Sequence, residues 1–449
     1  MNNFRELYQL MVKGSMAQAR WELEMSTNIL KSRKRMSILF LMLLPIVIGG
    51  IAIAAGDGTG LPNVLGGKNA YMPSHYTNLI FFASIFVGVC AGLITGCIGA
   101  GGGFIIAPAL MSAGVKGILA VGTDLFHIFA KAIMGSVLHR KLGNISVSLA
   151  VTFLIGSLTG ATLGGMLNRY LYDLNPVLSD LFITSVYVFI LAFLSFYALM
   201  DYFTARRGES AGKKQPEGGE AIPPLGQKVQ SVHIPPMLTF DEGVTPGGRK
   251  ISAVFLVLAG FVVGMAASIM GVGGGFLTFP IFVYGLGVSS MTTVGTDIFQ
   301  IVFTAGYSAL SQYALYGFVF YTLAMGMLLG SLIGVQVGSL VTKVVPGIQI
   351  RGFFALAVSA GFINRAFALP DKLQSLGYIK ITPELGKILG TVGNSLFFLI
   401  IGAFAIWVFY AFFSNIKKLK SEEPGVMINE SAVSPGFSSI SKELKSEGH

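Results

Sequence analysis

The 449-residue chain has little charge: Asp, Glu, Lys and Arg make up only 12% of it, whereas 53% is hydrophobic. Soluble domains carry about 25% charged residues, and a soluble fold would need a core larger than single domains build. The composition therefore excludes an ordinary soluble enzyme, a disordered chain and a nucleic-acid-binding protein. The 58 glycines follow no collagen repeat, and glycine is common in membrane helices. These features predict an all-α polytopic membrane protein.

Cysteine and the usual catalytic groupings are also scarce. The two cysteines, Cys90 and Cys97, lie in apolar sequence with no histidine or carboxylate at metal-ligand spacing, and we interpret them as packing residues. The sequence has no Ser/His/Asp arrangement, zinc spacing or paired carboxylates at a usable position, and no glycine-rich loop followed by Lys-Ser or Lys-Thr. We therefore expect no enzyme activity, no metal and no cofactor.

Positive charge is in excess, and its distribution indicates orientation. The formal net charge is +10, and basic residues collect near the N-terminus, in the central loop and after the last apolar run. Cytoplasmic loops of membrane proteins are enriched in Lys and Arg. We therefore expect the N-terminus, the central loop and the C-terminus to be cytoplasmic, with the lipid bilayer and not nucleic acid as the partner.

Apolar runs and polar breaks divide the chain into seven segments. We expect an amphipathic N-terminal arm, an extra N-terminal span, a first repeat, a mobile cytoplasmic loop, a second repeat, an extra C-terminal span and a cytoplasmic tail. In chain order these are residues 1–35, 36–55, 78–200, 201–250, 251–369, 389–413 and 414–449. A cleaved signal peptide at 36–55 is the weaker alternative, because its basic lead-in is unusually long.

The second half of the chain repeats the first. The segment Gly99-Ala100-Gly101-Gly102-Gly103-Phe104, with Pro108, returns as Gly271-Val272-Gly273-Gly274-Gly275-Phe276, with Pro280. The segment Val121-Gly122-Thr123-Asp124 returns as Val294-Gly295-Thr296-Asp297. The offset is 172 residues for the first pair and 173 for the second. Ordered matches at nearly one offset indicate a duplication, because chance similarity between apolar helices would match composition only.

Counting membrane crossings predicts how the repeats are oriented. If the glycine-broken stretch 78–113 crossed once, the basic linker 139–141 and the central loop would fall outside. If it enters and returns as a re-entrant hairpin, each repeat has one hairpin and three full crossings, and the basic segments lie inside. An odd number of crossings inverts the second repeat relative to the first, as in many secondary transporters.

The glycine breaks are the first candidate binding site. Backbone N–H groups at membrane depth must line a cavity or be buried in protein, and a helix that starts after the glycines directs its positive end at the gap. Close helix packing is the alternative, but two copies with a proline at the same distance favour a site. We predict substrate binding at Gly99, Gly101, Gly102, Gly103, Gly271, Gly273, Gly274 and Gly275, with Pro108 and Pro280 as hinge or structural residues.

Polar side chains near the two Gly-Thr-Asp segments form the second candidate. Spacings of three and four residues place them on one helical face in each repeat. The two sets are Thr123, Asp124, His127 and Lys131 in the first repeat, and Thr296, Asp297, Gln300 and Thr304 in the second. Ionisable groups inside a span usually face a partner or a wet cavity, so we predict substrate contacts for both sets. Two alternatives stay open: Asp124 neutralises a basic neighbour, or the two aspartates cap helix starts.

Other residues have simpler interpretations. We expect stripes of small residues to pack helices together; they contain Ser157, Gly160, Gly164, Ser331, Gly334 and Gly338. We expect Arg351 and Arg365 to extend from the two ends of their span toward the membrane surface.

The paired segments resemble the TauE/SafE family of sulfite and organosulfonate exporters. The resemblance rests on both G-x-G-G-G-F-x-x-x-P and both V-G-T-D segments, and it covers about residues 79–200 and 251–369. It implies a permease for small sulfur-containing anions, such as sulfite, sulfoacetate or other sulfonates, in the inner membrane of bacteria. The N-terminal arm, the first and last spans and the long central loop are additions to the family pattern.

Together these features predict a secondary transporter that works by alternating access at a site near the bilayer midplane. A membrane-embedded sensor or assembly subunit that uses the added termini, and an anion channel, are the alternative functions. Proton coupling through His127 and passive anion transport fit equally well. The pattern determines neither the direction of transport nor the oligomeric state.

Overall fold

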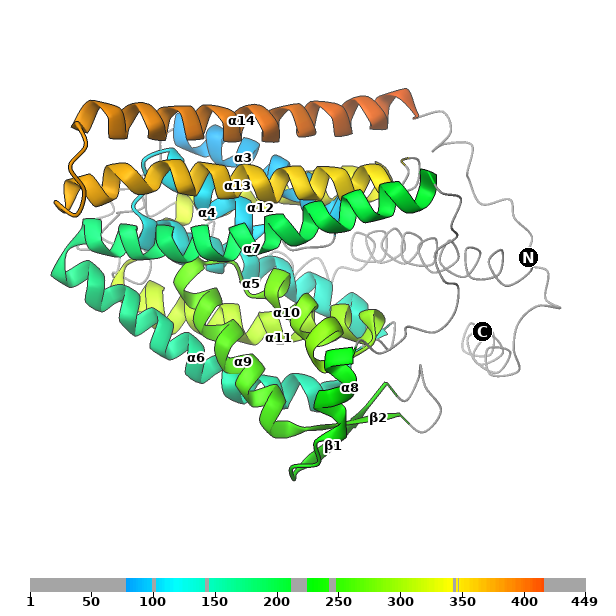
Figure 1. Ribbon diagram of the computed structural model, residues 1–449. Helices are drawn as coiled ribbons and strands as arrows, with labels where there is room; N and C mark the ends of the chain where they lie inside the picture. The colour runs from blue at the N-terminus through cyan, green and yellow to red at the C-terminus, as the bar shows by residue number, and fades with distance from the viewer. Residues whose placement is uncertain are drawn as a thin grey trace, which may run out of the picture.

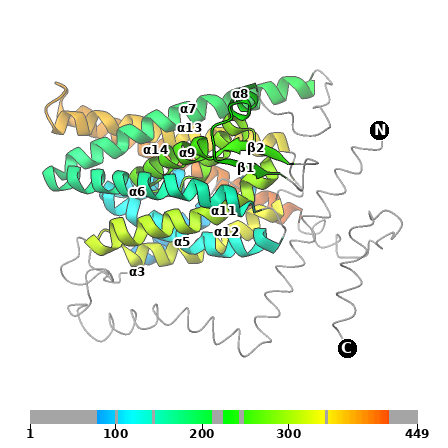
Figure 2. The ribbon, with the colours of Figure 1, turned by 90° about the horizontal axis from the view of Figure 1, so that it is seen from below.

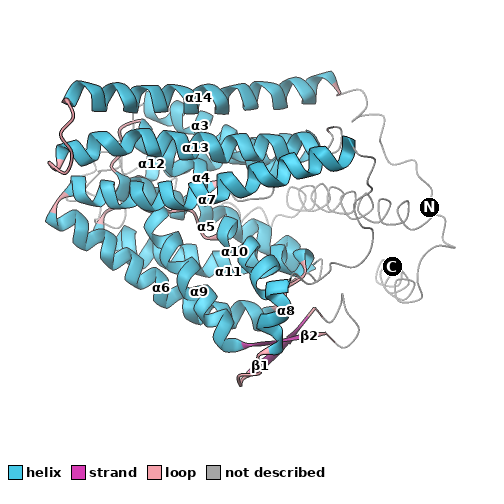
Figure 3. Cartoon of the chain, in the orientation of Figure 1, coloured by secondary structure: helices cyan, strands magenta, loops and turns pink. Residues whose placement is uncertain are grey.

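The computed structural model describes residues 78–98, 102–141, 145–210, 224–241, 248–341, 345 and 347–415 (Figure 1). The expected N-terminal arm, the expected first span, nearly all of the C-terminal tail, Gly99 and Gly101 lie outside these residues. Within them the chain is helical apart from two short strands and the connections (Figure 3). This confirms an all-α membrane protein.

The helices follow the same order in both halves of the chain. The first half has α3 (Asn78–Ile98), α4 (Gly103–Ser112), α5 (Gly117–Lys141), α6 (Val147–Leu174) and α7 (Pro176–Ser210). The second half has α9 (Ala253–Met270), α10 (Gly275–Pro280) with the π-helix η2 (Ile281–Leu286), α11 (Ser290–Tyr307) with η3 (Ser308–Tyr313) and η4 (Ala314–Tyr316), α12 (Tyr321–Val341) and α13 (Gly347–Ser375). A final helix, α14 (Pro383–Ser414), follows. In each half, a short helix begins directly after glycines.

Among the described residues, six helices are long and apolar enough to cross a membrane: α6, α7, α9, α12, α13 and α14. The expected C-terminal span is present as α14 and begins earlier than expected, at Pro383. The connection before it is correspondingly shorter, because α13 continues through Pro370 to Ser375. Beyond Pro370 the helix is tied to α7, since Lys372 Nζ lies 3.2 Å from Asp180 Oδ2.

The central segment differs from the mobile loop expected across 201–250. Its described parts are the end of α7, α8 (Pro224–Ser231), and the antiparallel strands β1 (Met237–Phe240) and β2 (Arg249–Ser252). Phe240 and Ile251 are buried in a core with α6 and α9, and the carboxylate of Asp241 accepts the backbone N–H of Ser289 at the start of α11 at 2.9 Å. These contacts order the segment, so the loop prediction is wrong there.

Two helix pairs pack closely across the halves: α3 against α12, and α6 against α9. Their contact surfaces are rich in glycine. A Cβ on Gly164 would lie 2.7 Å from the carbonyl oxygen of Met265, and one on Gly338 would lie 2.5 Å from that of Leu93. Only small residues allow backbones to approach in this way, which confirms the packing interpretation of the small-residue stripes.

Helices at matching positions in the two halves also pack against each other, as α5 on α11 and α7 on α13. In the second pair Asp201 Oδ2 lies 3.4 Å from Arg351 at one end, and Asp180 contacts Lys372 at the other. α7 and α13 therefore run antiparallel. They lie side by side, with α14 along the other side of α13 (Figure 1). Figure 2 shows the same helices from below.

Candidate functional site

The glycine breaks have a backbone that requires glycine. Gly102 has φ 67° and precedes α4, while Gly271, Gly273 and Gly274 have φ values of 83°, 67° and 89°. Residues with a Cβ rarely adopt this left-handed region. Gly102 and Gly274 each form the N-terminal cap of the short helix that follows, so the first N–H groups of α4 and α10 face the breaks.

The two breaks lie against each other. A Cβ on Gly103 would lie 3.0 Å from Cα of Val272, and one on Gly273 would lie 2.7 Å from the Cγ2 methyl group of Ile128. The rings of Phe104 and Phe276, which follow the two glycine runs, are 6.4 Å apart. Residues from both halves of the chain therefore build one common region, as the duplicated motif predicts.

The two threonines of the repeated motif hold helix starts in the opposite half. The hydroxyl oxygen of Thr123 accepts the N–H of Phe320, just before α12, at 2.9 Å. The hydroxyl oxygen of Thr296 accepts the N–H of Ser146, just before α6, at 3.0 Å. Both threonines are fully buried. This exchange gives both a structural role, and their contact with substrate stays a prediction.

In the second half, three side chains of the predicted polar set, Asp297, Gln300 and Thr304, are linked by hydrogen bonds. Gln300 donates to Asp297 Oδ1 at 2.9 Å, and Thr304 donates to Gln300 Oε1 at 2.8 Å. Ser157 of α6 lies 2.9 Å from Thr304 and extends this set. Asp297 also explains one glycine, because a Cβ on Gly275 would lie 3.0 Å from Asp297 Oδ2.

In the first half, the equivalent side chains are not linked to one another by hydrogen bonds among the described residues. His127 Nε2 lies 2.7 Å from Ser331 Oγ. Its Nδ1 is 3.5 Å from Asp124 Oδ1, and both side chains are fully buried. Neither carboxylate oxygen of Asp124, nor Nδ1 of His127, has a hydrogen-bond partner among the described residues. The expected pairing of Asp124 with a basic neighbour therefore involves His127.

Lys131 lies at the first glycine break. Its Nζ donates to Thr95 Oγ1 at 2.9 Å, and Thr95 in turn donates to the carbonyl of Ala91 at 2.8 Å. A Cβ on Gly102 would lie 2.7 Å from the same Thr95 oxygen. The ammonium group is thus fixed beside the break by a hydroxyl of α3. The sequence does not single out Thr95, since one threonine in an apolar helix forms no pattern.

The expectation for Arg365 is wrong, whereas Arg351 is exposed and lies 3.4 Å from Asp201. Arg365 is only 2% exposed. It donates to Asn364 Oδ1 at 2.7 Å, to the carbonyl of Pro108 at 3.2 Å and to Ser112 Oγ at 2.7 Å. Asn364 of α13 and two acceptors of α4, Pro108 and Ser112, hold the guanidinium inside the protein, and a cation is favourable at the negative end of a helix.

The fold, in which six described helices are long and apolar enough to cross a membrane, is that of a multi-pass α-helical membrane protein. Residues 84–364 match the family model described as sulfite exporter TauE/SafE. The chain therefore belongs to the TauE/SafE sulfite exporter family, which confirms the resemblance seen in the motifs.

Two relatives named as probable membrane transporters match the chain over most of their own length. The probable membrane transporter protein YjnA of Bacillus subtilis (strain 168) is 27% identical over 259 residues, which cover 57% of this chain and 87% of the relative. The probable membrane transporter protein YunE of the same organism is 23% identical over 272 residues, covering 59% and 89%. The sulfite exporter TauE/SafE family protein 6 of Arabidopsis thaliana is 29% identical over 129 residues, covering 28% and 30%. No solved structure matches the chain.

Proposed function

We propose that this protein is a secondary transporter of a small sulfur-containing anion, such as sulfite or an organosulfonate, across the bacterial inner membrane. The observation that carries the proposal is the position of Lys131, 2.9 Å from Thr95 and beside the Gly102 break. An anion in an apolar interior needs compensating charge and hydrogen-bond donors. Lys131 supplies the charge, and the N–H groups at the start of α4 supply donors.

The antiparallel packing of matching helices supports two inverted repeats. Gly122 of α5 lies against Tyr313 beyond α11, while Phe129 lies against Gly306 within it. α5 and α11 therefore run in opposite directions, as α7 and α13 do. Inverted repeats around a shared pair of broken helices are typical of alternating-access transporters. In this proposal the α3–α4 and α9–α10 pairs are re-entrant hairpins, and their breaks lie near the bilayer midplane.

The proposed substrate site has two unequal walls. The cationic wall is Gly102, Gly103, Asp124, His127 and Lys131, and Gly99 and Gly101 belong to the same motif. The second wall has no cationic residue and is formed by Gly273, Gly274, Gly275, Asp297, Gln300 and Thr304. An anion would bind nearer the first wall, because the polar groups of the second are already engaged with one another.

Transport by the purified full-length chain in proteoliposomes tests the proposal. Vesicles loaded with sulfite, sulfoacetate, thiosulfate or sulfate should exchange internal for external radiolabelled anion, with saturation and counterflow for at least one sulfur anion. Flux that rises linearly with the gradient and shows no counterflow would instead indicate a channel. Saturable binding with no flux would indicate a sensor or assembly subunit.

A further inference from the structure

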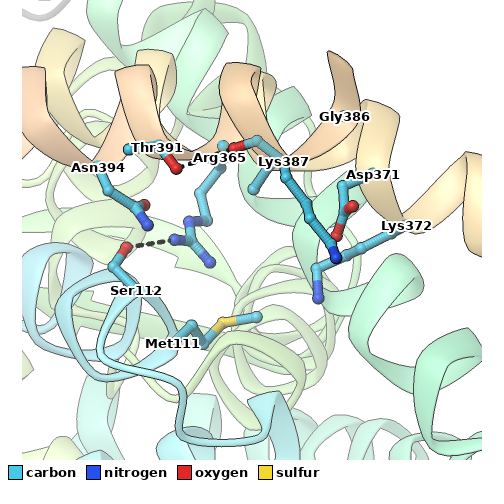
Figure 4. Close-up of a pocket in the computed structure, with 11 residues that line it drawn as sticks. Met111, Ser112, Arg365, Asp371, Lys372, Gly386, Lys387, Thr391 and Asn394 are labelled. Atoms are coloured by element: carbon cyan, nitrogen blue, oxygen red, sulfur yellow. Dashed lines mark hydrogen bonds between the residues drawn. The ribbon is translucent and has the colours of Figure 1, made fainter. Parts of the chain in front are cut away.

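A second polar site lies away from the glycine breaks. A cavity of about 390 Å³ opens between the end of α4, the last turns of α13 and the first turns of α14 (Figure 4). This volume falls within the usual range for small-molecule sites, about 300–1,000 Å³. Most of its lining lies beyond residue 364, where the match to the family model ends. The cavity is therefore largely built by the added C-terminal part of the chain.

The lining carries more positive than negative charge. Arg365, Lys372 and Lys387 line the cavity, with Asp371 as the one acidic residue. Lys372 is engaged by Asp180, 3.2 Å away. Lys387 lies on an exposed face of α14 and has no ion pair in the described part of the chain. Because Asp180 neutralises Lys372, the remaining charged residues of the lining are Arg365, Lys387 and Asp371, which together have a net positive charge.

Two further donors are fixed and available at the same place. Arg365 is held through Nε and Nη2 by Asn364, Pro108 and Ser112, which leaves its Nη1 group without an acceptor among the described residues. Asn394 of α14 accepts from Asn364 through Oδ1 at 2.8 Å, so its amide N–H groups stay free to donate. Figure 4 shows Arg365 between Asn394 and Lys387.

We propose that this cavity binds a small oxyanion through Arg365 Nη1, Lys387 Nζ and the amide of Asn394. Planar and point cations with an amide donor suit the several oxygens of a sulfate, sulfonate or phosphate group. The site is separate from the transport site, because the ten residues of α4 place about 15 Å between the two. The oxyanion is either free in the aqueous phase or the phosphate group of an anionic phospholipid.

The burial of Arg365 could be explained without a ligand, because its guanidinium donates to a carbonyl and a hydroxyl group near the end of α4 and so caps that helix. It would not explain the free Lys387 on α14. The test therefore leaves Arg365 intact. Lys387→Gln removes the charge, and Gly390→Leu fills the cavity, since a Cβ on Gly390 meets no atom within 4 Å. Lys380→Gln and Gly402→Leu are matched controls; Gly402, also on α14, likewise has no neighbour within 4 Å.

Equilibrium binding of radiolabelled sulfate to the full-length protein measures the site. A Lys131→Met background weakens the proposed transport site and leaves the cavity. In phosphatidylcholine nanodiscs, Lys387→Gln and Gly390→Leu should each weaken sulfate binding about tenfold or more, while both controls bind like the background protein. Chromatographic profile and melting temperature confirm folding, and Lys387→Gln carries the test if the leucine variant misfolds.

Adding phosphatidylglycerol to the nanodiscs distinguishes the two sources. Undiminished sulfate binding supports a free oxyanion, whereas competition by phosphatidylglycerol that Lys387→Gln abolishes supports a lipid phosphate. The proposal is overturned if both cavity variants bind sulfate as well as the controls do in both lipid compositions. Anion transport is measured with the protein that keeps Lys131, so the outcome of that assay does not depend on the sulfate-binding result.

Discussion

Replacing Lys131 by methionine tests the proposed transport site most directly. Methionine keeps much of the length and apolar stem of lysine and removes the charge. The only hydrogen bond that Lys131 donates within the described residues goes to Thr95, which still donates to Ala91 when the lysine is gone. The substitution therefore leaves no buried donor without a partner, and removing a charge should not hinder membrane insertion.

The expected loss of transport follows from the contact that Lys131 would make with the anion. Asp124 lies seven residues away, about 10 Å along the helix axis, and forms no ion pair with Lys131 among the described residues. The charge is therefore available to a ligand. A charge-assisted hydrogen bond contributes about 1.5–3 kcal/mol, so transport at low anion concentration should fall about 10-fold to 150-fold.

Two variants control for the change. Lys131→Arg should transport better than Lys131→Met without full recovery, because the guanidinium has a different geometry. Lys116→Met makes the same chemical change just before α5, where Lys116 Nζ donates to the Tyr172 hydroxyl at 3.0 Å, and it should leave transport unchanged. Proteoliposome uptake is the assay. If well-folded Lys131→Met transports like the parent, Lys131 does not contact the anion.

Three further predictions concern the scaffold and its orientation. Thr123→Val should lower the free energy of unfolding by about 1–3 kcal/mol, because the buried N–H of Phe320 loses its acceptor, while Thr123→Ser should not; equal melting temperatures would contradict the capping role. Gly264→Ala should lower the melting temperature by overpacking α9 against the backbone of α6, and a more stable variant would refute that contact. With the native cysteines removed, a cysteine at Ser231 should resist a membrane-impermeant thiol reagent in intact cells and one at Tyr378 should react; the reverse pattern would refute the proposed orientation.

The repeated motifs predict which residues matter better than they predict what each residue does. The V-G-T-D segments identify Thr123 and Thr296 as equivalent, and both make the same kind of hydrogen bond in the structure. Their partners lie 197 and 150 residues away in the chain. No local spacing encodes such a distance, so the sequence cannot tell a cap on a distant helix from a ligand contact.

Residues outside repeated patterns are the ones the sequence misses. Arg365 has the appearance of an arginine near the end of a span, and its burial depends on Ser112 and Pro108 of α4. The ordered central segment likewise depends on Asp241 reaching the start of α11. A polar, proline-rich composition is typical of a loop, and only the tertiary contact shows that part of it is held in place.

Equivalent positions in the two halves carry different charge on the same scaffold. His127 and Lys131 of the first half correspond to Gln300 and Thr304 of the second. Ser331 donates its hydroxyl hydrogen to the carbonyl of Met327 at 2.7 Å, so His127 Nε2 must be the donor in its contact with Ser331. His127 Nδ1 and Asp124 Oδ1 then face each other 3.5 Å apart, with both side chains fully buried. A single proton shared by the two side chains would leave the pair neutral as a whole. Lys131 is then the cation of this face, at the position where the second half has the uncharged Thr304. The two repeats thus share one architecture, and in the proposed transport site only the first supplies a cation, Lys131, where the second has Thr304.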